Sequence, residues 1–80
     1  MEFDIDFRSK TPSYQQLAAK IRQAIAAGEY APDEQIPSLK RFAQETGLAQ
    51  GTIQKAIKVL EAEGVIYTVN GRGSFVSPAK

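Results

Sequence analysis

The chain has 80 residues, which is enough for one small domain with a modest hydrophobic core. It contains no cysteine and no histidine. This excludes a disulfide framework and thiolate metal sites, fits a reducing cytosol, and removes the commonest metal ligand and catalytic base. The net charge is +1, but residues 38–60 together with Arg72 carry five basic side chains against one acidic, and the remainder carries five against eight. The uneven charge favours a polyanionic partner for the basic half.

The N-terminal residues 3–7, FDIDF, alternate strictly between apolar and acidic side chains. This alternation predicts a short strand. The first residues lack the basic region and apolar run of a signal peptide, and no stretch is long and apolar enough to span a membrane. We therefore expect no membrane partner.

The first helix is predicted over residues 14–27. Ser13 follows a proline and is a favourable N-cap residue. Gly28 is placed to end the helix in a left-handed conformation. The apolar stripe at helical spacing consists of Tyr14, Leu17, Ala18, Ile21, Ala24 and Ile25.

Residues 29–37, EYAPDEQIP, contain two prolines and show no helical pattern. They predict a tight connection in which Tyr30 and Ile36 turn inward. Ser38 follows as the N-cap of a short second helix over residues 39–46.

A third helix is predicted over residues 50–63. Gly47 ends the second helix, and Gly64 ends the third. A short helix and a longer one joined by a tight turn that contains glycine match the helix-turn-helix unit. The apolar stripe of the third helix consists of Ile53, Ala56, Ile57 and Leu60.

The C-terminal part predicts a β-hairpin. Residues 65–69 are β-branched and aromatic, residues 74–76 return as a second strand, and Asn70-Gly71 between them is a turn dipeptide in which both residues can take positive φ. Gly71-Arg72-Gly73 taken alone also resembles a phosphate-binding loop. No helix follows to receive a phosphate at its N-terminus, so a hairpin turn is the better interpretation.

The polar face of the third helix is a candidate DNA-reading surface. In a helix-turn-helix unit, the start of the second helix approaches base edges in the major groove. Glutamine can pair with adenine, threonine with a base or a thymine methyl, and lysine with guanine or phosphate. The exposed positions left after the apolar stripe is removed are Gln50, Gly51, Thr52, Gln54, Lys55 and Lys58.

Two further regions complete the candidate site. Lys40 and Arg41 in the first turn of the second helix can hold backbone phosphate, while Ser38 is above all a cap with phosphate contact as a secondary role. The hairpin then forms a wing, whose Arg72 can enter a minor groove.

The following residues, in chain order, carry a family resemblance: Pro12, Tyr14, Gln16-Leu17, Ile21 to Ile25, Gly28, Pro32, Ile36-Pro37-Ser38, Phe42-Ala43, Gly47-Leu48, Thr52-Ile53, Ala56, Leu60, Glu63-Gly64 and Gly71-x-Gly73-Ser74-Phe75-Val76. The series resembles the N-terminal winged-helix DNA-binding domain of GntR-type bacterial transcription regulators over about residues 12–76. The resemblance implies an α+β fold, a three-helix winged helix-turn-helix with a C-terminal β-hairpin wing, to which the alternation adds a short N-terminal strand. We expect no cofactor and no metal, because the chain lacks histidine and cysteine.

The resemblance also implies which positions contact DNA: Lys40, Gln50, Gly51, Thr52, Gln54 and the wing residues Asn70, Gly71, Arg72 and Gly73. Three of these depart from the family pattern, which usually has arginine at positions 40, 50 and 54. Two neighbours also depart, since Ala49 replaces a common serine or threonine and Asp33 replaces a common glycine. Fewer bidentate arginines predict weaker guanine recognition and an operator with more adenine contacts.

The implied partner is double-stranded DNA with a near-palindromic operator, bound as a homodimer at least on DNA, in the bacterial cytoplasm. Such regulators usually add a C-terminal effector-binding or oligomerisation domain, which residues 1–80 do not include. Residues 77–80, SPAK, read like the start of a linker. We expect a DNA-binding domain of a longer regulator, with a natural minimal protein as the other interpretation.

Other functional classes have less support. A winged-helix module that binds protein shares the same fold, so fold alone does not separate it from a DNA reader. The chain has no Walker pattern and no paired acidic residues on one inward face, which argues against an enzyme. It also has no aromatic strand motif typical of RNA-binding domains.

Overall fold

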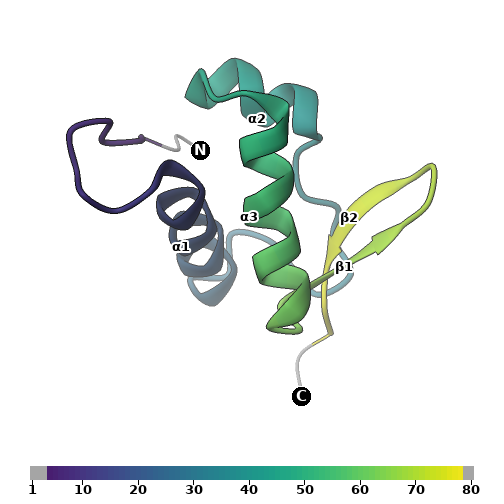
Figure 1. The fold of residues 1–80 in the computed structure, drawn as a ribbon. Coiled ribbons are helices and arrows are strands. Elements are labelled where there is room, and N and C mark those ends of the chain that lie inside the picture. Colours follow the sequence, from purple (N-terminus) through teal and green to yellow (C-terminus); the bar gives the residue numbers. More distant parts are fainter. Residues whose placement is uncertain (1–3, 79–80) are drawn as a thin grey trace.

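The computed structural model describes residues 4–78. Three helices are followed by a hairpin, which confirms the predicted α+β fold. The wing projects from the helices on the side of α3 that lies away from α1 (Figure 1). In chain order the elements are α1 (Ser13–Ala26), α2 (Leu39–Thr46), α3 (Gln50–Ala62), β1 (Ile66–Val69) and β2 (Gly73–Val76).

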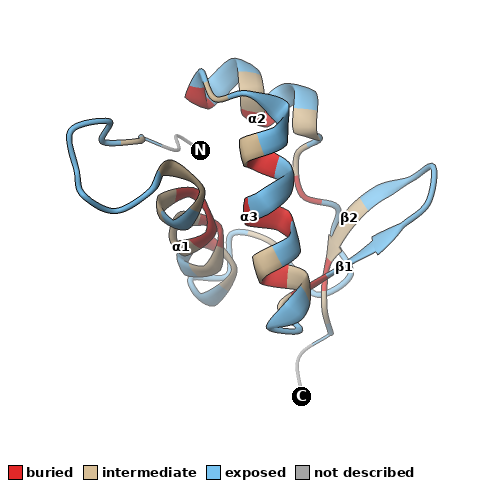
Figure 2. Cartoon of the chain, in the orientation of Figure 1, coloured by how far each residue is buried: buried red, intermediate tan, exposed pale blue. Residues whose placement is uncertain are grey.

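The hydrophobic core lies between α1, α2 and α3 and continues under the wing. The buried positions of α1 and α3 recur at helical spacing and form bands along both helices (Figure 2). The predicted inward stripes are therefore confirmed, with Tyr14 and Ile25 only partly buried. The largest fully buried side chains are Phe42, Leu17, Ile21, Ile53 and Leu60.

The start of α1 differs from the prediction. Ser13 is the first helical residue and not the cap, and no side chain caps the helix. The carbonyl of Pro12 already accepts the backbone N–H groups of Gln15 and Gln16 at 3.0 and 3.1 Å, so the helix begins one residue earlier than expected. Gly28, with φ +80°, follows its end as predicted.

Both ends of α2 have the predicted chemistry. The Ser38 hydroxyl oxygen accepts the Arg41 backbone N–H at 3.2 Å, and Gly47 takes φ 76° at the C-terminal end of α2. Thr46 strengthens the turn, because its hydroxyl donates to the Phe42 carbonyl at 2.7 Å and accepts the Leu48 N–H at 3.1 Å. The left-handed Gly47 and the two bonds of Thr46 thus fix the direction in which α3 leaves α2.

The wing is an antiparallel pair with Val69 opposite Gly73 and Ile66 opposite Val76. The Arg72 N–H donates to the Val69 carbonyl at 3.0 Å and closes the turn. The expectation of positive φ at Asn70 is wrong, because only Gly71 of this dipeptide takes it, at 78°. Positive φ at the second central residue alone is the pattern of a type II turn, which needs one glycine.

The connection before α2 also pairs with the wing, which the sequence analysis did not predict. Val76 donates to the Glu34 carbonyl at 2.9 Å, and Ile36 donates to the Ser74 carbonyl at 3.0 Å. Gln35 forms an antiparallel bridge with Phe75. The expected inward position of Ile36 follows from this pairing, and Tyr30 is partly buried.

The predicted N-terminal strand is wrong where it can be compared. Phe3 lies outside the described residues, and residues 4–7 contain no strand. The Gln16 side chain donates to the Asp6 carbonyl at 2.9 Å and accepts its N–H at 2.8 Å, so a side chain takes both groups that a neighbouring strand would use. Ile5 packs on the core, whereas Phe7 is 67% exposed. In residues 4–78, none of the helices has the length and apolar character needed to cross a membrane.

Candidate nucleic-acid interface

The first turn of α3 presents polar groups on an open surface. Gln50, Gly51 and Gln54 are exposed, and Thr52 is half-buried. No side chain caps the helix after Ala49. The free N–H groups and the positive end of the helix dipole therefore add to a surface suited to an anion.

A groove of about 360 Å³ separates α3 from the wing. It brings together four predicted site residues from three distant segments of the chain. Among the residues that line the groove, Glu61 is the acidic one and Lys58 the basic one, and both lie on α3. Its lining consists of Pro37, Ser38 and Leu39, of Gln54, Ile57, Lys58 and Glu61 on α3, and of Thr68, Gly73 and Ser74 on the wing.

The two predicted lysines of α3 have different environments. Lys58 lines the groove beside the wing. The Lys55 ammonium lies 4.3 Å from the centroid of the Tyr14 ring, which is a cation–π contact with α1. Lys55 therefore does not line the groove. Its ammonium lies over the Tyr14 ring near the start of α1.

Arg41 is engaged within α2. Its Nε donates to Glu45 Oε2 at 2.9 Å, and this hydrogen bond raises the pKa of Arg41. The guanidinium remains largely exposed, but Glu45 offsets its charge. Lys40 on the same turn is exposed, so it offers the more open cation for a phosphate.

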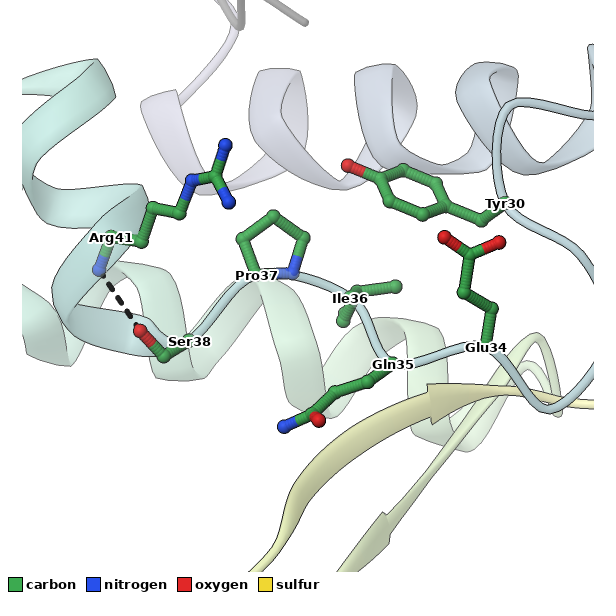
Figure 3. Close-up of a pocket in the computed structure, with 7 residues that line it drawn as sticks. All are labelled: Tyr30, Glu34, Gln35, Ile36, Pro37, Ser38 and Arg41. Carbon is green, nitrogen blue, oxygen red and sulfur yellow. Dashed lines mark hydrogen bonds between the residues drawn. The ribbon is translucent and has the colours of Figure 1, made fainter.

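Arg41 borders a second cavity of about 450 Å³ (Figure 3). Tyr30 and Glu34 lie on the same side of the connecting segment as Arg41, and Gln35 points to the other side. Burial raises the pKa of Tyr30, and the nearby charge of Arg41 only partly opposes the change. The phenol therefore stays neutral near pH 7, and the cavity combines an uncharged ring with charges of both signs.

The wing tip is fully open. Asn70, Gly71, Arg72 and Gly73 are all exposed, as expected for the predicted contacts. The Gln35 side chain donates from Nε2 to the Arg72 carbonyl at 2.6 Å. The sequence analysis missed this contact, because it joins residues 37 positions apart and no periodic pattern marks it.

A second unpredicted contact lies on the outer face of the wing. The Tyr67 hydroxyl donates to Asp33 Oδ1 at 2.7 Å, and this bond raises the pKa of Tyr67. The Tyr67 ring stacks on Phe75 with centroids 5.6 Å apart. Asp33 has φ 65°, the only positive value outside glycine among the described residues. A positive φ explains why a glycine would suit this position, the residue that the resemblance implies there.

The described part of the chain has no group of three histidine, cysteine, aspartate or glutamate residues that could hold a metal ion. The geometry instead offers a positive helix terminus at the start of α3, a groove between α3 and the wing, and an exposed wing tip.

Comparison with known proteins agrees with this geometry. Residues 13–76 match the family described as "Bacterial regulatory proteins, gntR family". The chain is 35% identical over 77 residues to the HTH-type transcriptional repressor NagR of Bacillus subtilis. These aligned residues make up 96% of this chain and 32% of NagR. It is 37% identical over 73 residues to the HTH-type transcriptional repressor YtrA of the same organism. This alignment covers 91% of this chain and 56% of YtrA. The chain therefore spans a third to just over half of these relatives.

A solved structure of the AraR DNA-binding domain in complex with operator ORX1 is also similar. The two share 32% identity with a TM-score of 0.88, over 96% of this chain and 99% of that one. Family match, sequence identity and fold therefore agree. The chain is a winged helix-turn-helix domain and belongs to the GntR family of bacterial regulatory proteins.

Proposed function

We propose that this chain binds double-stranded DNA in a sequence-specific manner, as the DNA-binding domain of a bacterial transcription regulator. The observation that carries the proposal is the likeness to the AraR domain bound to its operator, which extends over 99% of that domain. The basic half of the chain and the open start of α3 support it independently of any relative.

In the proposed complex, the first turns of α3 lie in the major groove. Gln50, Thr52 and Gln54 read base edges, and Gly51 lets the helix approach closely. Lys40 and Lys58 hold phosphates from α2 and from the groove beside the wing. These roles are proposed from side-chain chemistry and, for Gln54 and Lys58, from their shared place in the groove beside the wing.

The wing supplies the remaining contacts. Arg72 at the exposed tip enters a minor groove or meets the backbone, and Asn70, Gly71 and Gly73 shape the turn that presents it. Lys55 contacts a phosphate from its position over Tyr14, on the other side of α3 from the wing. Ser38 and Arg41 stay secondary, because the cap and the Glu45 pair already use part of their capacity.

The operator is proposed to be near-palindromic and bound by two copies of the chain, with more adenine contacts than arginine-rich relatives make. The named relatives are repressors, and we extend that role to this chain. Its place of action in this proposal is the cytoplasm.

Selection of bound duplexes from a random pool tests the proposal most directly. We expect one enriched half-site, repeated in inverted orientation at one spacing. G·C-rich half-sites under α3 would overturn the adenine preference. Absence of DNA binding even at low salt would instead favour the protein-interaction module.

The salt dependence of binding provides the physical check. The logarithm of the affinity should fall with the logarithm of the salt concentration, with a slope of about −0.9 for each phosphate neutralised. Replacement of Lys55, Lys58 and Arg72 by alanine should flatten this slope, whereas alanine at the exposed α1 residue Gln23 should not.

A further inference from the structure

The wing tip is tied to the segment before α2 by one side chain. Gln35 Nε2 donates to the Arg72 carbonyl at 2.6 Å. Gln35 points away from the cavity that contains Tyr30 and Glu34 (Figure 3). Its amide therefore serves the wing and not that cavity.

The backbone alone cannot make this bond. Along the outer edge of β2, Val76 pairs with Glu34 and Ser74 accepts from Ile36. Acceptors on one edge of an antiparallel strand recur at every second residue, so the Arg72 carbonyl is the next one. The next backbone donor in this alternation would be the N–H of Ser38, but Ser38 is the N-cap of α2, so the chain turns into the helix there and the backbone ladder ends. The Gln35 side chain supplies the missing donor.

Gly73 is matched to this arrangement. A Cβ atom built on Gly73 would lie 2.7 Å from Gln35 Nε2, closer than real Cβ contacts occur. Gly73 also has φ +113°, which other residues rarely adopt. The absence of a side chain at Gly73 thus lets the Gln35 amide reach the backbone beside it.

We infer that Gln35 is a positioning residue, which holds the wing tip in one conformation and so aims Arg72 at the DNA. The ordering of the wing tip concerns the free protein, whereas the aiming of Arg72 at DNA rests on the proposed function. A tip that is ordered before binding does not have to lose its backbone freedom in the complex. Gln35 itself need not touch DNA for this effect.

The first test uses the free protein. Gln35→Met keeps the length of the side chain but removes the donor, and Gln23→Met on α1 is the matched control. In ¹⁵N relaxation measurements, we expect the amides of residues 70–73 to become more mobile in Gln35→Met alone, with α3 unchanged. Equal mobility of the wing tip in both variants would overturn the inference, whether or not the chain binds DNA.

The second test uses the selected operator duplex. We expect Gln35→Met to weaken binding about three- to tenfold, the range that corresponds to one net hydrogen bond. In an Arg72→Ala background the same change should have no further effect, because the residue being positioned is gone. An equal loss in both backgrounds would show that Gln35 acts by another route and would overturn the positioning role.

The two tests also separate this inference from the proposed function. A chain that binds no DNA at low salt refutes the proposed function. The relaxation data then still decide whether Gln35 orders the wing.

Discussion

Arg22 and Glu63 form a bidentate ion pair that joins α1 to the C-terminal end of α3. Arg22 Nε donates to Glu63 Oε1 at 2.9 Å, and its terminal nitrogen donates to Oε2 at 2.7 Å. The side chains are 43% and 40% exposed, so water screens the pair and limits its strength. The contact nevertheless bridges 41 positions of sequence and fixes the two longest helices against each other.

A double-mutant cycle measures this bridge. Arg22→Ala and Glu63→Ala should each lower the free energy of unfolding, with a coupling of about 0.5–1 kcal/mol in urea denaturation. The coupling should shrink at high salt. Arg41 and Glu45, paired within α2, are the matched control, and their coupling should be smaller, about 0.3–0.5 kcal/mol. A larger coupling in the control would contradict a special role for the bridge between helices.

Two glycines of the helix-turn-helix unit should respond to alanine in opposite directions. Gly47 has φ +76°, and a Cβ there meets no atom within 4 Å, so the cost of Gly47→Ala is backbone strain of about 1–2 kcal/mol. Gly47→Asn should cost less, because asparagine tolerates the left-handed region better. Gly51 lies inside α3 with equally free space and ordinary φ, so Gly51→Ala should stabilise the fold by about 0.5–1 kcal/mol. Thermal unfolding of the three variants checks the order, and a destabilised Gly51→Ala protein would contradict it.

The Gly51→Ala variant also tests how closely the DNA approaches the start of α3. A more stable fold with weaker operator binding would indicate that the DNA backbone or a base edge approaches position 51 closely. Unchanged affinity would show that this part of α3 stays clear of the duplex.

Local patterns were sufficient for most of the fold. The bounds of α2 follow from Ser38 and Gly47, since a side-chain cap and a left-handed glycine act within one turn of helix. The predicted wing follows in the same way from its β-branched runs and from Gly71. These signals act over a few residues, so they can be recognised in a single sequence.

Contacts between distant segments could not be predicted in this way. The bonds of Gln35 with Arg72 and of Asp33 with Tyr67 exist only because the connection before α2 pairs with the wing. The prediction of a strand near the N-terminus was wrong for a related reason, because a strand needs a neighbouring strand with which to form hydrogen bonds. Gln16 occupies the backbone groups of Asp6 instead. For the candidate site, the sequence predicted that the polar side of α3 is exposed, but it did not predict the position of Lys55 over Tyr14.

The bond between Tyr67 and Asp33 should make the wing sensitive to alkaline pH. Because the bond favours the neutral phenol, the folded pKa of Tyr67 lies above the unfolded value of about 10. Its contribution to stability is therefore complete below pH ~10 and is lost as the pH rises through the folded pKa. In an NMR titration of the ring resonances, Asp33→Ala should return this pKa toward its ordinary value. An identical titration curve in both proteins would show that the bond does not form in solution.

Substitution of a residue proposed to read bases should affect DNA affinity differently from substitution of a residue proposed to hold phosphate. Thr52→Ala and Gln54→Ala should each cost about 1–3 kcal/mol on the selected operator and leave binding to unrelated DNA unchanged. Lys58→Ala should weaken both complexes alike and should reduce the salt slope by about 0.9, since its ammonium serves any phosphate. Fluorescence anisotropy with the operator and a scrambled duplex, at several salt concentrations, measures both effects. Gln23→Ala on α1 is the neutral control. If all three site variants lose the same affinity for both duplexes, α3 binds DNA only through its charge and does not read sequence at these positions.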